Sequence, residues 1–538
     1  MSETEKEETR KENFKAWLKN PYNFIFIGIF LLAIIIRIYY FSLTSSQPLW
    51  WDESVYMSYA KNLAGLNIKF VAAGSQLSLF SYIAALFFKF GLSEAGIKLL
   101  LEIFPSIFLV FLTYKICILM YNDKRIALIS SFLMAVSWAV LFNSMRFHVD
   151  IPSLFFGFLS IYVFWKGYEK KEKIFFRIDS KWAIPLTLVL VLLTFTIRKG
   201  YFMFGFFFLF YMILTRKFKD LIKDKYNWLA LIILIFLVLI GKGFLFSGAE
   251  TQYHPETKLN LLLFQVFNSF FKNIFNSKLS LLFYLFWIGF VILVFELIFL
   301  IGYLKASIKE KSNLFVFLML VITLSYFIFV VRDPGEPRWY FPVLLASFIC
   351  ISKASLKIAD YTRKFKFAPI IVIILLIGYS GYYQLKHSDM IIKNKLETYK
   401  GVKDSSLFVK SISSDTDILI SKSLPQTAYY SEREVLSPGP PDKPLEDFLS
   451  ELKENKNIRF LLVSFWEPGN PEFMVKQVYA SDVNGNPMLV KWEVPFMETT
   501  IDFSTGQQNI IQEKEYNNIK FKLINVLDRV FIYEIIHK

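Results

Sequence analysis

The sequence predicts an α-helical polytopic membrane protein of about eleven spans, followed by a small C-terminal extracytoplasmic α/β domain. Of its 538 residues, 55% are hydrophobic and 18% aromatic, in long apolar segments that short basic runs interrupt. After about Lys386 the composition becomes that of an ordinary soluble domain. Three regions are therefore expected: a cytoplasmic segment over residues 1–20, a transmembrane domain over 21–386 and an extracytoplasmic domain over 387–538.

Each predicted span is an apolar segment close to the roughly 17 to 25 residues that a helix needs to cross a bilayer. The segment Leu77–Phe90 is not counted, and we expect it to lie in the interface or re-enter the membrane. Counting it would move Lys124 and Arg125 to the outer side, against the tendency of basic residues to stay inside. The spans lie near residues 22–43, 97–119, 126–143, 151–167, 183–197, 200–214, 228–246, 279–303, 313–331, 340–353 and 368–385.

The basic loops predict the orientation. Lys and Arg gather in every second loop, and such loops are typically cytoplasmic. The net charge of +15 is explained by this topology, so no nucleic-acid partner is expected. The N-terminus is predicted inside and the C-terminal domain outside. The first loop and the turns RFHVDIP, TIRKG and DPGEPRWY then all face the outer side.

The C-terminal domain shows short apolar runs typical of buried strands, at residues 417–421, 458–464 and 529–536. Residues 445–454 have helical spacing, with Pro444 at the start. These patterns predict a small α/β domain.

The first loop carries the adjacent carboxylates Asp52 and Glu53 behind Trp50 and Trp51, at the point where the first span ends. The residues after them have the spacing of an amphipathic helix. Acids at a membrane boundary suit general-base catalysis or metal coordination. The alternative is helix capping, with Asp52 as the N-cap.

The turn RFHVDIP places Arg146, His148 and Asp150 within five residues at the outer end of a span. Three kinds of ionisable group between two apolar spans indicate substrate binding. The alternative is a boundary turn in which Arg146 pairs locally with Asp150.

The adjacent cations Arg198 and Lys199 lie on the side that basic residues usually avoid. An anion explains this exception, and a lipid phosphate at the membrane edge is the natural ligand. The alternative is that both side chains snorkel to the interface.

Two further outer segments offer binding residues. Arg338 precedes Trp339 and Tyr340, so it is predicted to bind phosphate beside a sugar or a prenyl chain, although an aromatic belt also explains the two rings. The longer loop over residues 248–278 contains His254, a weaker candidate for contact with the acceptor.

Three of these segments resemble a known family. WWDES, RFHVDIPSLFFGFLSIYVF and TIRKG are similar to motifs of the GT-C membrane glycosyltransferases that use polyprenyl-phosphate sugars, in particular the protein O-mannosyltransferases and the lipid A aminoarabinose transferases. The resemblance extends to about Thr215, with a weaker echo at EPRWYFP. It implies that Asp52 is the catalytic carboxylate of the first loop and that Glu53 completes an acidic pair. It also implies that Asp150 is the acid of the second outer loop and that Lys199 approaches the donor phosphate.

Together these observations predict an inverting transfer of a sugar from a polyprenyl-phosphate donor, such as a dolichyl-phosphate mannose, to a hydroxyl of a protein, lipid or glycan on the outer face. Asp52 would accept the hydroxyl proton. Leaving-group charge would be stabilised by Arg198, Lys199 and Arg338, or by Mg²⁺ or Mn²⁺ at Asp52 or Asp150. The residues assigned to substrate contact are Arg146, His148, Asp150, Tyr340 and His254.

Two other classes remain open. A lipid-linked sugar transporter or flippase would bind the same groups without chemistry, and a non-catalytic membrane scaffold would use the outer domain for binding. No inverted repeat with broken helices, the pattern typical of transporters, is visible in the sequence.

Overall fold

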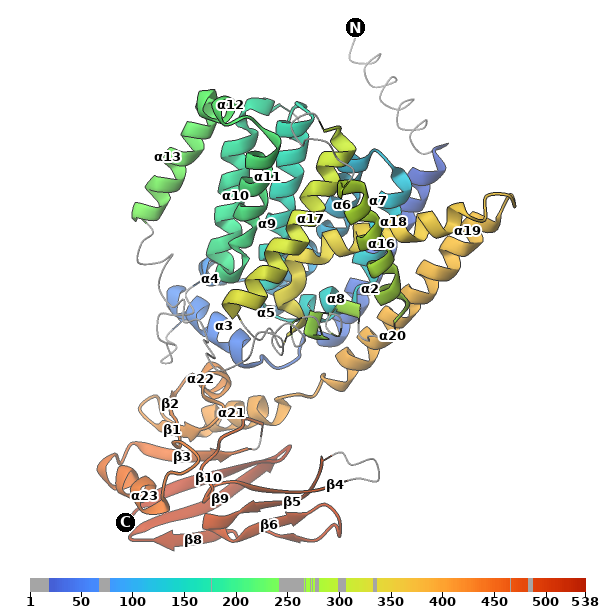
Figure 1. Ribbon diagram of the computed structural model, residues 1–538. Helices are drawn as coiled ribbons and strands as arrows, with labels where there is room; N and C mark the ends of the chain where they lie inside the picture. Colours follow the sequence, from blue (N-terminus) through green and yellow to red (C-terminus); the bar gives the residue numbers. More distant parts are fainter. Residues whose placement is uncertain are drawn as a thin grey trace, which may run out of the picture. The chain divides into compact units, whose positions relative to one another are not determined.

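The computed structural model describes residues 19–66, 78–175, 177–240, 266, 268–270, 272, 274–275, 280–298, 306–331, 336–464, 466–481 and 487–538. The chain forms two compact units (Figure 1). The helical unit comprises Met1–Ser45, Ser78–Phe80 and Ser93–Leu396. The mixed unit comprises Ser46–Leu77, Ser81–Leu92 and Glu397–Lys538.

The helical unit is built from long apolar helices, several of which contain short 3₁₀ or π segments. In chain order these are α2 Pro21–Thr44, α5 Glu94–Lys98, η2 Leu99–Ile103, α6 Phe104–Tyr121, α7 Lys124–Val136, α8 Trp138–Ser144, α9 Asp150–Val163, η3 Phe164–Glu169, η4 Ser180–Trp182, α10 Ala183–Ile197, η5 Lys199–Tyr201, α11 Met203–Thr215, α12 Phe218–Lys223, α13 Lys225–Ile240, α16 Leu281–Ile298, α17 Ile308–Tyr326, η7 Phe327–Val331, η8 Pro337–Val343, α18 Leu344–Asp360, α19 Ala368–Ile373, η9 Ile374–Gly378 and α20 Tyr379–Asn394.

The helices coincide with the predicted apolar segments, and the helical membrane architecture is confirmed. Within the described residues, seven helices are long and apolar enough to cross a membrane, or eight when the bent pair α7 and α8 counts as one span. The predicted number of eleven is not confirmed. The segment that we left out of the spans forms α4, Leu79–Lys89, whose 11 residues are too few to cross a bilayer.

A buried arginine sits at the break between α7 and α8, where the two helices meet at 48° around Ser137. Arg37 of α2 is fully buried and donates hydrogen bonds to the carbonyl of Ala135 at 3.0 Å and to Ser106 Oγ at 2.7 Å. A helix break leaves carbonyls without intrahelical donors, and apolar surroundings supply none. Arg37 therefore stabilises the bend after which α8 leads into the turn before α9.

Close packing holds the centre of the helical unit. Gly289 of α16 lies so close to α18 that a Cβ there would be 1.9 Å from the carbonyl oxygen of Cys350. Cys350 and Cys117 are buried free thiols, so both act as small packing residues.

In its described residues, the mixed unit contains two sheets, the four helices given below and most of α4. One sheet has six strands in the order β2-β1-β3-β10-β9-β8, with β2, β1 and β3 parallel, and the other has four antiparallel strands in the order β4-β5-β6-β7. The elements are α3 Trp51–Leu63, α21 Lys400–Ile412, β1 Ile418–Ser421, α22 Leu424–Ser431, β2 Glu434–Leu436, α23 Leu445–Glu454, β3 Ile458–Val463, β4 Lys476–Ser481, β5 Pro487–Val494, β6 Thr499–Asp502, β7 Gln508–Asn509, β8 Glu513–Tyr516, β9 Ile519–Leu527 and β10 Val530–His537.

The strands predicted from apolar runs are confirmed as β1, β3 and β10, and the predicted helix as α23, with Pro444 as its N-cap. The four-stranded sheet was not predicted. Its edge strand β4 is mostly exposed, so no run of apolar residues marks it.

The first loop belongs to the mixed unit, an association that the sequence did not predict. The backbone N–H of Leu49 donates to the hydroxyl of Tyr430 at 2.8 Å, and Lys403 Nζ donates to the carbonyl of Ser46 at 3.0 Å. Lys61 of α3 lies 3.9 Å from the centre of the Tyr429 ring. The predicted helix after the two acids is confirmed as α3, and it is anchored on α22.

Candidate functional site

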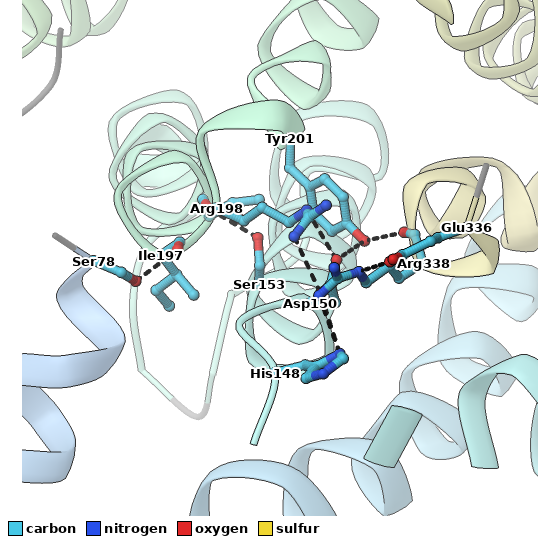
Figure 2. A network of polar contacts seen from close by, with 10 residues as sticks. Ser78, His148, Asp150, Ser153, Ile197, Arg198, Tyr201, Glu336 and Arg338 are labelled. Atoms are coloured by element: carbon cyan, nitrogen blue, oxygen red, sulfur yellow. Dashed lines mark hydrogen bonds and ion pairs between the residues drawn. The ribbon is translucent and has the colours of Figure 1, made fainter. Parts of the chain in front are cut away.

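The site in the helical unit is centred on Asp150, the first residue of α9, which is fully buried. Helix α10 packs beside α9 and ends at Ile197, so the next residue, Arg198, returns to the start of α9. Arg198 Nε lies 2.8 Å from Asp150 Oδ1, and Nη1 donates to Oδ2 at 3.2 Å (Figure 2). This two-point ion pair links the start of α9 to the end of α10.

A second arginine reaches the same carboxylate from η8. Arg338 Nη1 lies 3.8 Å from Asp150 Oδ2 and 3.3 Å from His148 Nδ1. Its Nε donates to the exposed Glu336, two residues earlier. Figure 2 shows both guanidinium groups directed at Asp150 from opposite sides. Three segments far apart in the sequence therefore meet at one carboxylate.

Tyr201 connects the two arginine-bearing segments. Its hydroxyl lies 2.7 Å from the carbonyl of Arg338 and 3.3 Å from Asp150 Oδ1 (Figure 2). The guanidinium of Arg198 also lies over the Trp339 ring, 4.8 Å from its centre. These contacts restrict both guanidinium groups, which is what a pre-organised anion site requires.

His148 is neutral in this environment. Burial lowers its pKa well below the ordinary value of 6.5, and the charges of Arg338, Arg146 and Arg198 lower it further. A guanidinium only donates, so Nδ1 of His148 must accept from Arg338 and the ring proton must be on Nε2. The 4.0 Å approach of His148 to Asp150 is therefore no ion pair. His148 orients Arg338.

The electrostatic balance favours an anion over a metal. Two guanidinium groups already neutralise Asp150, so a divalent cation there would face both of them. Among the residues that the structure describes, no three His, Cys, Asp or Glu side chains come together to hold a metal. Asp150 is thus held between two arginines, and a metal at Asp52 or Asp150 stays a prediction.

Arg146 is buried in the turn before α9. The boundary-turn alternative paired Arg146 with Asp150, but in the structure Asp150 pairs with Arg198 and Arg338 instead.

The remaining predicted residues lie in other segments. Tyr340 is fully buried and donates its hydroxyl to the carbonyl of Val266 at 3.2 Å. Its role in substrate binding stays a prediction. Lys199 begins η5 and is half-buried, and His254 lies outside the described residues.

The first-loop acids occupy the first turn of α3. The N-cap is Trp50, not Asp52 as the capping alternative supposed, because the helix begins at Trp51. The buried carboxylate of Glu53 accepts from the backbone N–H of Trp50 at 3.4 Å, as in a capping box. Asp52 is partly exposed. The structure gives Glu53 a capping contact, and the catalytic roles of Asp52 and Glu53 stay predictions.

Sequence reasoning missed two residues of the network, Tyr201 and Glu336. Tyr201 is three residues after Arg198, so one turn of 3₁₀ helix brings both to the same side of the segment. Glu336 is two residues before Arg338 in a segment already singled out. Both residues join the network around Asp150 only because these distant segments come into contact.

Part of the helical unit matches a known protein family. Residues 79–248 match the family model described as Dolichyl-phosphate-mannose-protein mannosyltransferase. This range contains Asp150, Arg198 and Lys199. No curated protein matches the sequence.

Solved structures share the fold over most of the chain. The oligosaccharyltransferase of Archaeoglobus fulgidus in its apo form is 12% identical with a TM-score of 0.58, over 88% of this chain and 75% of that one. The oligosaccharyltransferase AglB of the same organism, in complex with an inhibitory peptide and a dolichol-phosphate, is 11% identical with a TM-score of 0.59, over 88% and 74%. ArnT from Cupriavidus metallidurans bound to undecaprenyl phosphate is 9% identical with a TM-score of 0.54, over 94% and 97%.

The chain therefore has the fold of the GT-C membrane glycosyltransferases. Its segment over residues 79–248 matches the mannosyltransferase family within that class. The shared fold and the segment match both support a membrane glycosyltransferase.

Proposed function

We propose that this protein transfers a sugar from a polyprenyl-phosphate donor to a hydroxyl of a protein, lipid or glycan on the outer face of a cell membrane. The single observation that carries the proposal is the convergence of Arg198 and Arg338 on Asp150. Asp150 and Arg198 lie within the segment that matches the mannosyltransferase family. Two structural neighbours were solved with dolichol-phosphate and with undecaprenyl phosphate.

The arginines are assigned to the donor phosphate. A phosphate monoester leaving group carries two negative charges and offers oxygen acceptors to planar guanidinium groups. Asp150 holds both groups in position before the donor arrives. Lys199 follows Arg198 directly and is assigned a further contact to the same phosphate.

Asp52 is assigned to the acceptor. The acceptor oxygen attacks the anomeric carbon as the bond from that carbon to the phosphate oxygen breaks. The hydroxyl proton passes to the Asp52 carboxylate, and polyprenyl phosphate leaves with the bonding electron pair. A single displacement inverts the anomeric configuration. Phosphate is a good leaving group, so charge stabilisation replaces the general acid of glycosidases.

The test is consumption of a panel of labelled polyprenyl-phosphate sugars by the purified protein, with candidate acceptors. Wild type is compared with Asp52→Asn, and Asp447→Asn is the matched control because Asp447 is an exposed acid in the first turn of α23 in the same unit. We expect acceptor-dependent sugar release by wild type and Asp447→Asn, but not by Asp52→Asn.

Two outcomes would contradict the proposal. Transfer by Asp52→Asn at the wild-type rate would remove the assignment of the base. A donor that every variant binds and none consumes would indicate a transporter or a scaffold instead. Repeating the assay with a chelator tests whether Mg²⁺ or Mn²⁺ is needed.

A further inference from the structure

A cavity of about 480 Å³ lies at the opposite end of the α9–α10 pair from Asp150. Helix α9 runs away from Asp150 toward η3, and α10 runs back from η4 to Arg198, so η3 and η4 share the far end of the pair. The cavity is lined by Tyr168 and Lys171 after α9, by the first turn of α10 and by residues 223–226. It is therefore separate from the site already described.

The lining of this cavity is strongly basic. Four lysines line it, Lys171, Lys181, Lys223 and Lys225, against one carboxylate, that of Asp224. Asp224 is already engaged, because its Oδ1 accepts the backbone N–H of Tyr226 at 2.9 Å. The positive charge of the lysines is thus compensated only in small part by the lining itself.

A carboxylate in the turn before Lys171 is also engaged. Glu169 of η3 lies 2.8 Å from Arg216 and 3.7 Å from Lys311. The N-terminal ends of η4–α10 and of α13 both line the cavity, but each already has a carboxylate cap: Asp179 accepts the backbone N–H of Lys181 at 2.9 Å, and Asp224 accepts that of Tyr226 at 2.9 Å. The excess of lysines over carboxylates in the lining is therefore what favours an anionic ligand.

Lys171 shows local strain at the cavity. It is a non-glycine residue with φ of +57°, a left-handed conformation that costs backbone energy. Its Nζ lies 4.7 Å from the centre of the Tyr168 ring, and the guanidinium of Arg216 lies 5.0 Å from the same ring. Burial lowers the pKa of Lys171 and the charges of Arg216 and Lys311 lower it further, while the carboxylates of Glu169 and Asp224 act in the opposite direction. A bound anion would offset both effects.

Two exposed indoles lie close in sequence to lining residues of the cavity. Trp182 of η4 is 45% exposed and Trp228 of α13 is 50% exposed, and exposed indoles gather where a membrane meets water. Helix α13 then presents large apolar side chains outward, among them Ile232, Phe236 and Leu239. Basic cavities between membrane helices at this depth suit the headgroups of anionic lipids.

We propose that this cavity binds the phosphate of an anionic phospholipid headgroup, with Lys181, Lys223 and Lys225 as the contacting cations. The chains of the lipid would lie along the exposed face of α13. A free phosphate ion has the same recognition chemistry, and the experiment separates the two sources. The site does not depend on glycosyl transfer, because none of its residues belongs to the Asp150 network.

The test measures binding to the full-length protein in neutral detergent, with short-chain phosphatidylglycerol, short-chain phosphatidylcholine and inorganic phosphate as probes. The cavity variant is Lys181→Ala with Lys223→Ala. The matched control is Lys217→Ala with Lys219→Ala, two exposed lysines near α12 that do not line the cavity. Equal thermal unfolding of the three proteins without lipid checks that both variants fold.

We expect phosphatidylglycerol to bind wild type and the control alike, and the cavity variant roughly tenfold or more weaker. Phosphatidylcholine should bind none of them selectively. Displacement of phosphatidylglycerol by inorganic phosphate at a similar concentration would support the site and identify free phosphate as its occupant. Equal binding of phosphatidylglycerol by the cavity variant and the control would overturn the proposal.

Discussion

Arg198 and Asp150 are 48 residues apart in the chain, yet Arg198 Nε lies 2.8 Å from Asp150 Oδ1 at the start of α9. The pair joins the end of α10 to the beginning of α9, and Arg338 approaches the same carboxylate from η8. Asp150 is therefore both a structural connection and the residue that aims two guanidinium groups. Its substitution should reveal both roles.

Asp150→Asn should lower the free energy of unfolding by about 3–5 kcal/mol, because it leaves buried guanidinium charge uncompensated. Arg198→Gln should mainly weaken donor binding. The double variant Asp150→Asn with Arg198→Gln should be more stable than the sum of the two single effects predicts, since it removes both charges. Thermal unfolding in detergent and a donor-binding assay measure these effects. Strictly additive losses would show that the pair is not coupled.

Tyr201→Phe should lower the free energy of unfolding by about 1 kcal/mol and weaken donor binding, because the hydroxyl positions the Arg338 backbone. Tyr121→Phe is the matched control, because it removes a hydroxyl that donates to Asn313 Oδ1 at 3.1 Å and has no contact with the Asp150 network. We expect a comparable stability loss there but unchanged donor affinity. An equal loss of donor affinity in Tyr121→Phe would show that the effect of Tyr201→Phe is not specific to the Asp150 network.

Variants of Asp52 and Glu53 should show which acid is needed for sugar transfer and which for capping α3. Glu53→Gln keeps an acceptor for the backbone N–H of Trp50, so it should retain near wild-type transfer and stability. Glu53→Ala should lose about 1 kcal/mol of stability. Asp52→Asn should lose transfer while keeping its fold. Abolished transfer in a stably folded Glu53→Gln protein would show that Glu53 has a chemical role as well.

His148 should make the protein sensitive to acid. Its pKa is lowered in the folded protein, so below about pH 6.5 the unfolded chain takes up a proton that the native site refuses, and stability falls as pH falls. His148→Gln keeps an acceptor for Arg338 without this titration. We expect the difference in melting temperature between about pH 7.5 and about pH 5.5 to be smaller in His148→Gln than in wild type. An equal difference in both proteins would assign the acid sensitivity to other groups.

The sequence by itself determined the helical membrane class, the separate C-terminal region and most of the charged residues that gather at Asp150. Length and apolarity decide which segments are helices in a membrane, because every backbone group there must be bonded internally. Rare charged residues beside such segments, among them Asp150 and Arg198, stand out because they are costly there. Local patterns were enough for these conclusions.

The tertiary structure decided which charges meet. Arg146 is the cation nearest to Asp150 in sequence within its turn, yet Arg198 and Arg338 neutralise that carboxylate, because the antiparallel packing of α9 and α10 and the approach of η8 bring them there. It also gave Glu53 its capping contact and placed the first loop on α22. Such pairings depend on which distant segments pack together, and no local periodicity encodes that.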